Sequence, residues 1–306
     1  MDFIFSPEQD ELRSAVRSVL ADAVASGVVR SAVDGDLAAT GERARELWAT
    51  MVDLGWHGVL VPEEAGGLGL GLVDAVVVLE ELGRVTAPGP FLSSAVTATL
   101  AARELGLGDL LGALGSGDRT ATVALEESGH GDPVEQVRTR AVRKGASWRL
   151  HGVKPVVLDA DVADATAVAL AAELVGVSEA ALAMATAYAD QRVQFDVPLS
   201  SHQVIQHKLV DMLHALELGR VGVHHAAWAF DTTDEHAGRS AAIAKASMAE
   251  AAVAVTGDNI QIHGAVGFTW ESDAHVLFKR AKQNDLLYGY QGWQRRRVAD
   301  SLLGST

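Results

Sequence analysis

Apolar residues between positions 163 and 188 recur at alternating spacings of four and three, and this period constrains the fold more than any other feature of the chain. It places one apolar stripe along a single long helix. Such a stripe has to be buried against other helices, so the pattern predicts a helical bundle. The stripe consists of Ala163, Ala167, Leu170, Leu174, Val177, Ala181, Met184 and Tyr188.

Four later segments also predict helices, so a four-helix bundle is expected over residues 163–306. The first of them repeats the apolar spacing, and the second is rich in alanine. The segments are marked by Ile205, Leu209, Met212 and Leu216, by residues 236–260, by residues 274–288 and by residues 290–303.

Residues 1–115 predict a separate N-terminal helical domain. Ser6 can cap a helix that begins at Pro7, and Gln9 stands where a capping box needs Glu or Gln. A second helix is expected over about 40–55.

The glycine-rich segment 61–84, "VPEEAGGLGLGLVDAVVVLEELGR", predicts a loop followed by a helix from Val76 to Leu82 that ends near Gly83. The glycines lack the G-x-G-x-x-G spacing of a dinucleotide-binding loop, and a Pro-Glu-Glu turn precedes them instead of a strand. A phosphate-binding role is therefore not expected here.

Residues 116–162 differ in texture, because short β-branched runs alternate with Gly, Asp and Pro. They predict about four strands, at 119–125, 136–145, 147–153 and 155–160. So small a sheet has to pack on something else to be stable. The expected fold class is mainly α with a small β-domain.

Charge and composition exclude several classes of function. Asp and Glu number 40 against 25 Lys and Arg, and the net charge of −15 argues against nucleic acid and anionic membranes as partners. There is no cysteine, so thiol chemistry is excluded. The N-terminus lacks the pattern of a signal peptide, and no uncharged stretch approaches the roughly 18–20 residues of a membrane span. A cytoplasmic location is expected.

Three polar patterns are interpreted as structural. His202, His207 and His214 share one amphipathic helix, but no carboxylate completes a ligand set, so no metal site is expected. The run 295–297 of three arginines is interpreted as a solvated face or a set of ion pairs. A G-x-S-x-G nucleophile motif is absent.

Four motifs, in order along nearly the whole chain, carry a family resemblance. They are "VPEEAGGLGLGLVDAVVVLEELGR" at 61–84, "LEESGHGDP" at 125–133 with "WRLHGVKPVVLDADVADA" at 148–165, "YADQRVQFDVPLSSHQVIQHKLVDM" at 188–212, and "QIHGAVGFTWE" at 261–271. Together they resemble the signatures of acyl-CoA dehydrogenases. The resemblance implies an N-terminal helical domain, a middle β-domain and a C-terminal four-helix bundle that mediates tetramer formation.

The resemblance also implies FAD as cofactor, held mainly by a neighbouring subunit. The motif match assigns contacts with its adenosine-diphosphate half to Arg192, Gln194, Phe195, Gln261 and the backbone around Gly264. A guanidinium can form a fork of hydrogen bonds to pyrophosphate oxygens, and glycine allows close backbone approach. The sequence departs from the family at two positions, where Asp196 and Ala265 replace glycines.

The middle domain is truncated relative to full-length members of the family, because residues 159–165 run almost directly into the first bundle helix. In this respect the chain is similar to the shortened subunits of heteromeric steroid-CoA dehydrogenases in steroid-degrading bacteria. The resemblance therefore implies a homologous partner subunit, a heterotetramer, and a bulky acyl-CoA substrate.

Both family positions of the catalytic base lack a carboxylate. Alignment places Tyr288 where the glutamate is expected, and Thr166 at the alternative position. Tyrosine, with a reference pKa of about 10, is a poor base near neutral pH. Asp285 and Glu173 are the weak candidates nearby, and a structural role is favoured for each.

Three hypotheses stay open from the sequence. The first is a subunit that completes the flavin site of a partner and lacks its own base. The second is a self-sufficient acyl-CoA dehydrogenase with an unusual base. The third is a scaffold or binding protein of the same fold that has lost FAD.

Overall fold

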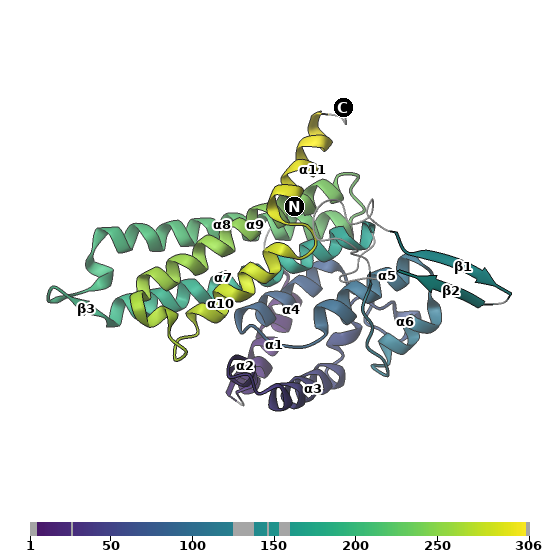
Figure 1. The fold of residues 1–306 in the computed structure, drawn as a ribbon, viewed down its shortest axis with the longest axis horizontal. Helices are drawn as coiled ribbons and strands as arrows, with labels where there is room; N and C mark the ends of the chain where they lie inside the picture. Colours follow the sequence, from purple (N-terminus) through teal and green to yellow (C-terminus); the bar gives the residue numbers. More distant parts are fainter. Residues whose placement is uncertain (1–4, 26, 125–137, 146, 153–159, 304–306) are drawn as a thin grey trace.

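The computed structural model describes residues 5–25, 27–124, 138–145, 147–152 and 160–303. Most of these residues are helical, as expected for the mainly α fold (Figure 1). The longer elements in chain order are α1 (Pro7–Ala25), α2 (Val28–Val33), α3 (Leu37–Asp53), α4 (Leu72–Arg84), the π-helical segment η3 (Phe91–Ala98), α5 (Thr99–Glu104), α6 (Gly108–Gly115), β1 (Arg140–Lys144), β2 (Ser147–His151), α7 (Ala160–Gln191), β3 (Val193–Gln194), β4 (Val197–Pro198), α8 (Gln203–Asp231), α9 (Ala237–His263), the 3-10 helix η5 (Gly264–Phe268), α10 (Ala274–Leu286) and α11 (Gln291–Leu303).

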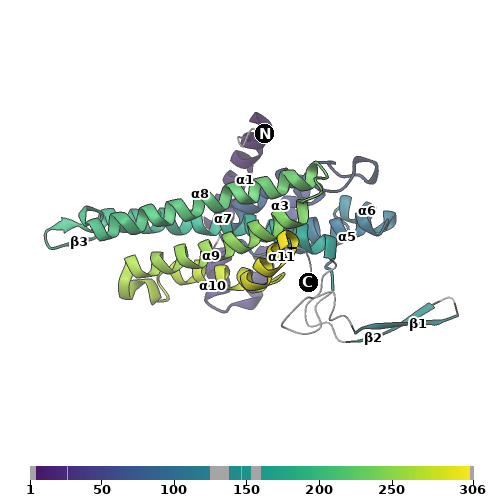
Figure 2. The ribbon, with the colours of Figure 1, turned by 90° about the horizontal axis from the view of Figure 1, so that it is seen from above.

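Helix α7 is the centre of the molecule. It packs with α8, α9 and α10 in the C-terminal bundle and with α4 of the N-terminal helices (Figures 1 and 2). Every residue from Ala165 to Ser178 is buried, so this part of α7 has no solvent-facing side. The predicted stripe is buried as expected, but the opposite face of this stretch is buried as well, because α4 packs against α7.

The apolar character of α7 is explained by this central position. From Asp164 to Gln191 the helix is long and apolar enough to cross a membrane by composition alone, although Glu173 and Glu179 interrupt it. In the fold, 72% of its most apolar window is buried inside the protein. The sequence contains no long uncharged stretch, and this criterion alone understated how apolar α7 is.

Two glycines allow α4 and α7 to touch through their backbones. A Cβ added at Gly83 would lie 2.0 Å from the carbonyl oxygen of Glu173, and one added at Gly176 would lie 1.8 Å from that of Glu80. The predicted helix end near Gly83 agrees with the observed end at Arg84. What the sequence did not indicate is that Gly83 is a packing glycine.

Helix α4 begins four residues before the predicted start at Val76. The amides of Leu72 and Val73 donate to the carboxylate of Asp231, at 2.6 and 2.9 Å. Asp231 is the last residue of α8, so this cap comes from a distant part of the chain. A carboxylate satisfies the free amides at a helix N-terminus, and local sequence gives no sign of it.

The first helix begins as predicted. The Gln9 amide donates to Ser6 Oγ at 3.3 Å, and the Ser6 amide donates to Gln9 Oε1 at 3.0 Å, which is a capping box.

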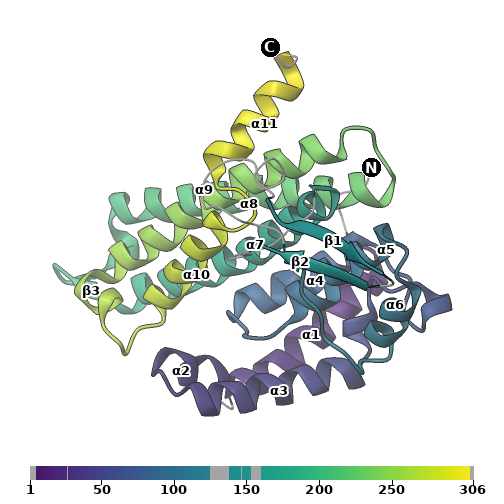
Figure 3. The ribbon, with the colours of Figure 1, turned by 45° about the vertical axis from the view of Figure 1, so that its right-hand side comes forward.

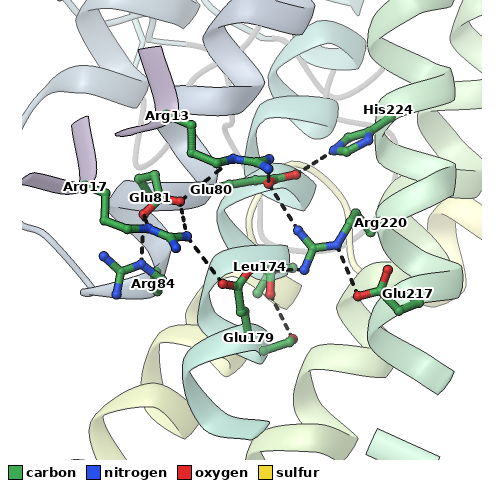
Figure 4. Close-up of polar contacts among 11 residues, drawn as sticks. Arg13, Arg17, Glu80, Glu81, Arg84, Leu174, Glu179, Glu217, Arg220 and His224 are labelled. Carbon is green, nitrogen blue, oxygen red and sulfur yellow. Dashed lines mark hydrogen bonds and ion pairs between the residues drawn. The ribbon is translucent and has the colours of Figure 1, made fainter. Parts of the chain in front are cut away.

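A buried ionic network joins α1 and α4 to α7 and α8 (Figure 4). The side chains of Glu80 and Glu81 are 3% exposed and accept charged partners on several sides. Burial raises the pKa of Glu81, but its arginine hydrogen bonds outweigh this and hold the pKa below its ordinary value. The partners are Arg13, Arg220 and His224 for Glu80, and Arg17 and Arg84 for Glu81.

Only part of the predicted β-domain is observed as strands within the described residues. β1 and β2 form an antiparallel hairpin, in register from Arg140 opposite His151 to Lys144 opposite Ser147. The prediction of a strand at 119–125 was wrong over 119–124, where the Ala121 amide donates to Ser94 Oγ instead of joining a ladder. Strand propensity without a neighbouring strand does not make a sheet. Residues 155–159 of the predicted strand at 155–160 lie outside the described residues. The motif at 125–133 lies outside them as well.

Candidate functional site

The first flavin motif forms a tight turn at one end of the bundle. After α7, β3 and β4 pair as an antiparallel ribbon, and the Leu199 amide donates to the Arg192 carbonyl oxygen at 2.8 Å. The two turn residues, Phe195 and Asp196, have φ values of +55° and +66°. Positive φ at both positions matches a type I′ hairpin turn. Aspartate is one of the few residues with a side chain that adopt this conformation readily, so Asp196 can replace the family glycine.

The side chains of this turn face solvent. Phe195 is 88% exposed, and Arg192 and Gln194 are exposed. No side chain in the described part of the chain forms an ion pair with Arg192. The ring of His202 lies edge-on to Phe195, with 6.1 Å between the centroids, and supports the ribbon from α8.

The second flavin motif lies at the same end of the bundle (Figures 1 and 2). Helix α9 ends at His263, whose ring stacks on Tyr188 of α7 with centroids 4.2 Å apart. Gly264 has φ +64° and ψ −140°, a conformation that strongly favours glycine. Ala265 follows in η5 without a positive φ, so the loss of the second family glycine does not strain the backbone.

These residues fit an adenosine diphosphate group. Arg192, Gln194 and Gln261 are exposed and supply guanidinium and amide donors, and the open ring of Phe195 offers a stacking surface. The backbone at Gly264 carries no side chain to obstruct a ligand. We therefore retain the roles predicted for these five residues as a proposal.

The two family base positions meet in space, although 122 positions separate them along the chain. Thr166 donates to Thr97 Oγ1 at 3.2 Å, and the phenol of Tyr288 lies near enough to the Thr97 side chain for Thr97 to lower its pKa. Thr97 in turn donates to the Leu92 carbonyl oxygen at 2.9 Å within η3. Thr97 and Thr166 are buried, so a neutral hydroxyl cluster lies at the positions that the family resemblance assigns to the base.

Tyr288 cannot accept a proton near neutral pH. Burial raises the pKa of its phenol to about 12, and the nearby Thr97 side chain opposes this only in part. A phenol is in any case protonated at pH 7, so it holds no free electron pair of the required basicity.

The loop that carries Tyr288 is held firmly. Its residues Tyr288 and Gly289 have φ values of +60° and +83°. The buried Gln294 donates to the Tyr288 carbonyl oxygen at 2.8 Å, and Arg297 donates to Gln294 Oε1 at 3.1 Å. Arg297 also forms a forked ion pair with Asp164 at 2.5 and 2.7 Å, which joins the loop to the start of α7.

The two weak base candidates are both buried. Glu173 forms an ion pair with Arg280, which ties α7 to α10. Asp285 Oδ2 lies 3.8 Å from Lys282 Nζ, and its Oδ1 has no hydrogen-bond partner among the described residues. Neither carboxylate reaches the Thr97 cluster through a described hydrogen bond.

Lys245 is a buried cation beside Asp285 that the sequence did not single out. Its Nζ donates to the Asp285 carbonyl oxygen at 3.2 Å, and its side chain is fully buried in the bundle. Burial lowers its pKa to about 8, although the Asp285 charge opposes this.

The burial of Lys245 is expected to make the free energy of unfolding vary with pH in the alkaline range. Its pKa is lower in the fold than its ordinary 10.5, so the unfolded chain binds more protons between about pH 8 and 10.5. The free energy of unfolding should therefore rise over that interval, by up to about 3 kcal/mol. Urea unfolding at pH 7.5, 9 and 10 measures this rise. Lys245→Met should abolish it, and an equal rise in the variant would contradict the assignment.

Two of the three arginines in the run 295–297 form described ion pairs. Arg295 pairs with Glu250, so the arginine run contributes ion pairs. In the described part of the chain, no three His, Asp or Glu side chains converge in an arrangement that could hold a metal ion.

Thr97 is the site residue that sequence reasoning missed. The run "SSAVTAT" at 93–99 places four hydroxyl side chains in an otherwise apolar segment, and this was the available signal. In the structure the segment is π-helical, a form that occurs frequently at functional sites.

Comparison with known proteins identifies the class. Residues 6–108 match the model of the acyl-CoA dehydrogenase N-terminal domain, and residues 161–303 match that of the C-terminal domain. The Mycobacterium tuberculosis protein "Acyl-CoA dehydrogenase IpdE2" is 32% identical over 298 residues, covering 90% of this chain and 91% of that one. The chain belongs to the acyl-CoA dehydrogenase family.

Two solved structures share the fold. The "Tcur3481-Tcur3483 steroid ACAD" superimposes with a TM-score of 0.86 at 29% identity, covering 97% of this chain and 98% of that chain. The ChsE4-ChsE5 complex from Mycobacterium tuberculosis also has a TM-score of 0.86, at 24% identity and full coverage of both chains. The family comprises FAD-dependent oxidoreductases that act on CH–CH bonds, so FAD is the cofactor.

Proposed function

We propose that this chain is the non-catalytic subunit of a heteromeric acyl-CoA dehydrogenase. It completes the flavin site of a homologous partner, and the partner supplies the base. The substrate class is a bulky acyl-CoA, with steroid-derived thioesters as the leading candidates. A heterotetramer of two copies of each subunit is the proposed assembly.

The observation that carries the proposal is the separation of the two sites along α7. Thr166 lies near the start of this helix, and Arg192 follows its end. At 1.5 Å per residue they are roughly 40 Å apart, which is longer than an extended dinucleotide cofactor. The flavin residues at the bundle end therefore serve a different reaction centre from the one around Tyr288.

Only one of these two centres keeps the groups that its role requires. At the bundle end, Arg192, Gln194 and Gln261 would hold the diphosphate half of FAD. The flavin ring of bound FAD would supply the acceptor for the hydride from the substrate β-carbon. Around Tyr288, no carboxylate among the described residues hydrogen-bonds to the hydroxyl cluster at Thr97. The proposed role of this chain is therefore to bind and orient, with the proton acceptor supplied by the partner.

The relatives favour a two-subunit assembly. Two of the matched structures each contain two different named proteins, Tcur3481 with Tcur3483 and ChsE4 with ChsE5. The first of them is a steroid enzyme and is 29% identical to this chain. These names support the partner and the substrate class by similarity.

A second candidate is a self-sufficient dehydrogenase that uses Asp285 as base. One observation favours it: Asp285 Oδ1 is buried without a partner in the described residues, and Asp285 lies three positions before Tyr288. An unpaired buried carboxylate oxygen is costly and is found at functional positions.

Removing either local carboxylate separates the two candidates. Asp285→Asn and Glu173→Gln keep the size of each side chain and remove its charge. In the assembled enzyme, the turnover of acyl-CoA with an artificial electron acceptor should stay within about threefold for each variant, since one lost proton acceptor typically costs 100-fold or more. A 100-fold loss for Asp285→Asn, with flavin retained, would favour the second candidate.

A further inference from the structure

The hairpin of β1 and β2 projects from the helical body (Figures 1 and 2), and in Figure 3 it lies in front of the helices. Every residue in both strands is exposed. A two-stranded sheet is marginal in water by itself, so this hairpin is expected to gain order from a surface that covers it.

The register divides the hairpin into two unlike faces. Residues opposite each other in an antiparallel pair point to the same side, and neighbours along a strand point to opposite sides. One side, the apolar face, therefore carries Ala141, Trp148 and Leu150, together with Arg143. The other side, the basic face, carries Arg140, Lys144, Arg149 and His151, together with Val142 and Ser147.

The apolar face has the residue types of an interface anchor. Trp148 is 63% exposed and Leu150 is 70% exposed, although both are large and apolar. The guanidinium of Arg143 lies 6.0 Å from the Trp148 ring centroid. Tryptophan and arginine are the residues that dominate binding energy at protein interfaces.

The basic face indicates the charge of the surface that it binds. Residues 140–151 contain three arginines and one lysine and no acidic residue, in a chain whose net charge is −15. Such a local reversal of charge attracts an acidic surface. An anionic membrane would be repelled by the rest of the chain, so the charge balance favours a protein.

We propose that the β1–β2 hairpin is a docking arm that binds an acidic, partly apolar surface of the partner subunit. The apolar face packs against the partner, and the basic face pairs with its carboxylates. The inference rests on the proposed function, because the occupant is the dehydrogenase subunit of the heteromer. No strand among the described residues pairs with the outer edges of β1 and β2, and such an edge can accept a strand of the partner.

The test measures binding of the full chain to a homologous full-length acyl-CoA dehydrogenase chain from the same genome. The double variants Trp148→Ala with Leu150→Ser, and Arg140→Glu with Arg149→Glu, should each weaken the complex at least tenfold. The control Leu105→Ser changes another exposed leucine, outside the hairpin, and should leave the affinity unchanged. All of these side chains are exposed, so unchanged thermal unfolding should show that each variant still folds.

Hydrogen exchange of the wild-type chain gives a second readout. The amides of β1 and β2 should exchange more slowly in the complex than in the free chain, and no slowing would overturn the proposal. Equal affinity of the wild type and both hairpin variants would overturn the docking arm and leave the proposed function standing. Failure of the wild-type chain to bind would overturn both.

Two other outcomes would assign the arm to a different occupant. Self-association of the free chain that the hairpin variants abolish would point to a second copy of this chain. Binding to phosphatidylglycerol vesicles that the variants abolish would point to a membrane. Either result would overturn the assignment to the partner subunit.

Discussion

Arg192→Ala is expected to weaken FAD binding by the assembled enzyme about 10- to 100-fold. Arg192 is exposed at the bundle end and is the one guanidinium of the first flavin motif. A hydrogen bond to a charged group contributes about 1.5–3 kcal/mol, and each 1.4 kcal/mol is a factor of ten in Kd. Titration of the flavin-depleted complex with FAD, followed by absorbance, measures the change.

The matched variants make this result specific. Arg192→Lys keeps the charge but loses the planar fork, so an intermediate loss is expected. Arg296→Ala removes an exposed arginine on α11, outside the flavin motifs, and should leave Kd unchanged. Equal FAD affinity in the wild type and Arg192→Ala would contradict the role of Arg192, and a wild-type complex that binds no FAD would favour a scaffold that has lost the cofactor.

Gly176→Ala is expected to destabilise the chain by about 3 kcal/mol or more. The new Cβ would lie 1.8 Å from the Glu80 carbonyl oxygen and 2.6 Å from the Arg84 amide nitrogen. Both obstacles are backbone atoms of α4, so no side chain can move aside. Helices α4 and α7 would have to separate, and the buried ion pairs of Glu80 lie beside the same contact. Overpacking of this kind commonly costs about 1–3 kcal/mol, sometimes more.

Gly222→Ala is the control for helix propensity. Gly222 lies inside α8, and a Cβ there would meet no atom closer than 3.9 Å. Alanine is favoured over glycine in a helix by about 1 kcal/mol, so this variant should be as stable as the wild type or more stable. Urea unfolding of both variants compares them, and similar midpoints would contradict the close contact between α4 and α7.

The helical parts of the fold were predictable because they depend on local patterns. The apolar period placed α7 and α8 in a bundle, and the residues Ser6 and Gln9 marked the start of α1 through their own hydrogen bonds. The sequence did not show that α7 is covered on all sides. That depends on α4, which is brought against it by two glycines more than ninety residues apart.

The candidate site was predictable only where a motif carried it. Arg192 and Gln261 were found by resemblance, and the structure places their motifs at one end of the bundle. Thr97 has no motif, and its role comes from meeting Thr166 and Tyr288 in space. The cap on α4 from Asp231 and the burial of Lys245 likewise depend on contacts between distant segments.

The hydroxyl cluster around Thr97 indicates a structural role for the loop that carries Tyr288. The family resemblance predicts only that a glutamate is missing, but the structure shows a packed group of neutral side chains, with the Tyr288 carbonyl oxygen bound by Gln294. Such a cluster stabilises the fold around the position that the resemblance assigns to the base. It is consistent with a subunit whose remaining role lies at the other end of α7.

The most direct test of the proposed function compares the chain alone with the chain co-purified with a homologous full-length acyl-CoA dehydrogenase from the same genome. Flavin absorbance and the dehydrogenation of bulky acyl-CoA thioesters would be measured on equal amounts of each, with FAD added. We predict that the complex is yellow and active, and that the chain alone shows no turnover. Robust dehydrogenation by the chain alone would contradict the proposal that it lacks its own base.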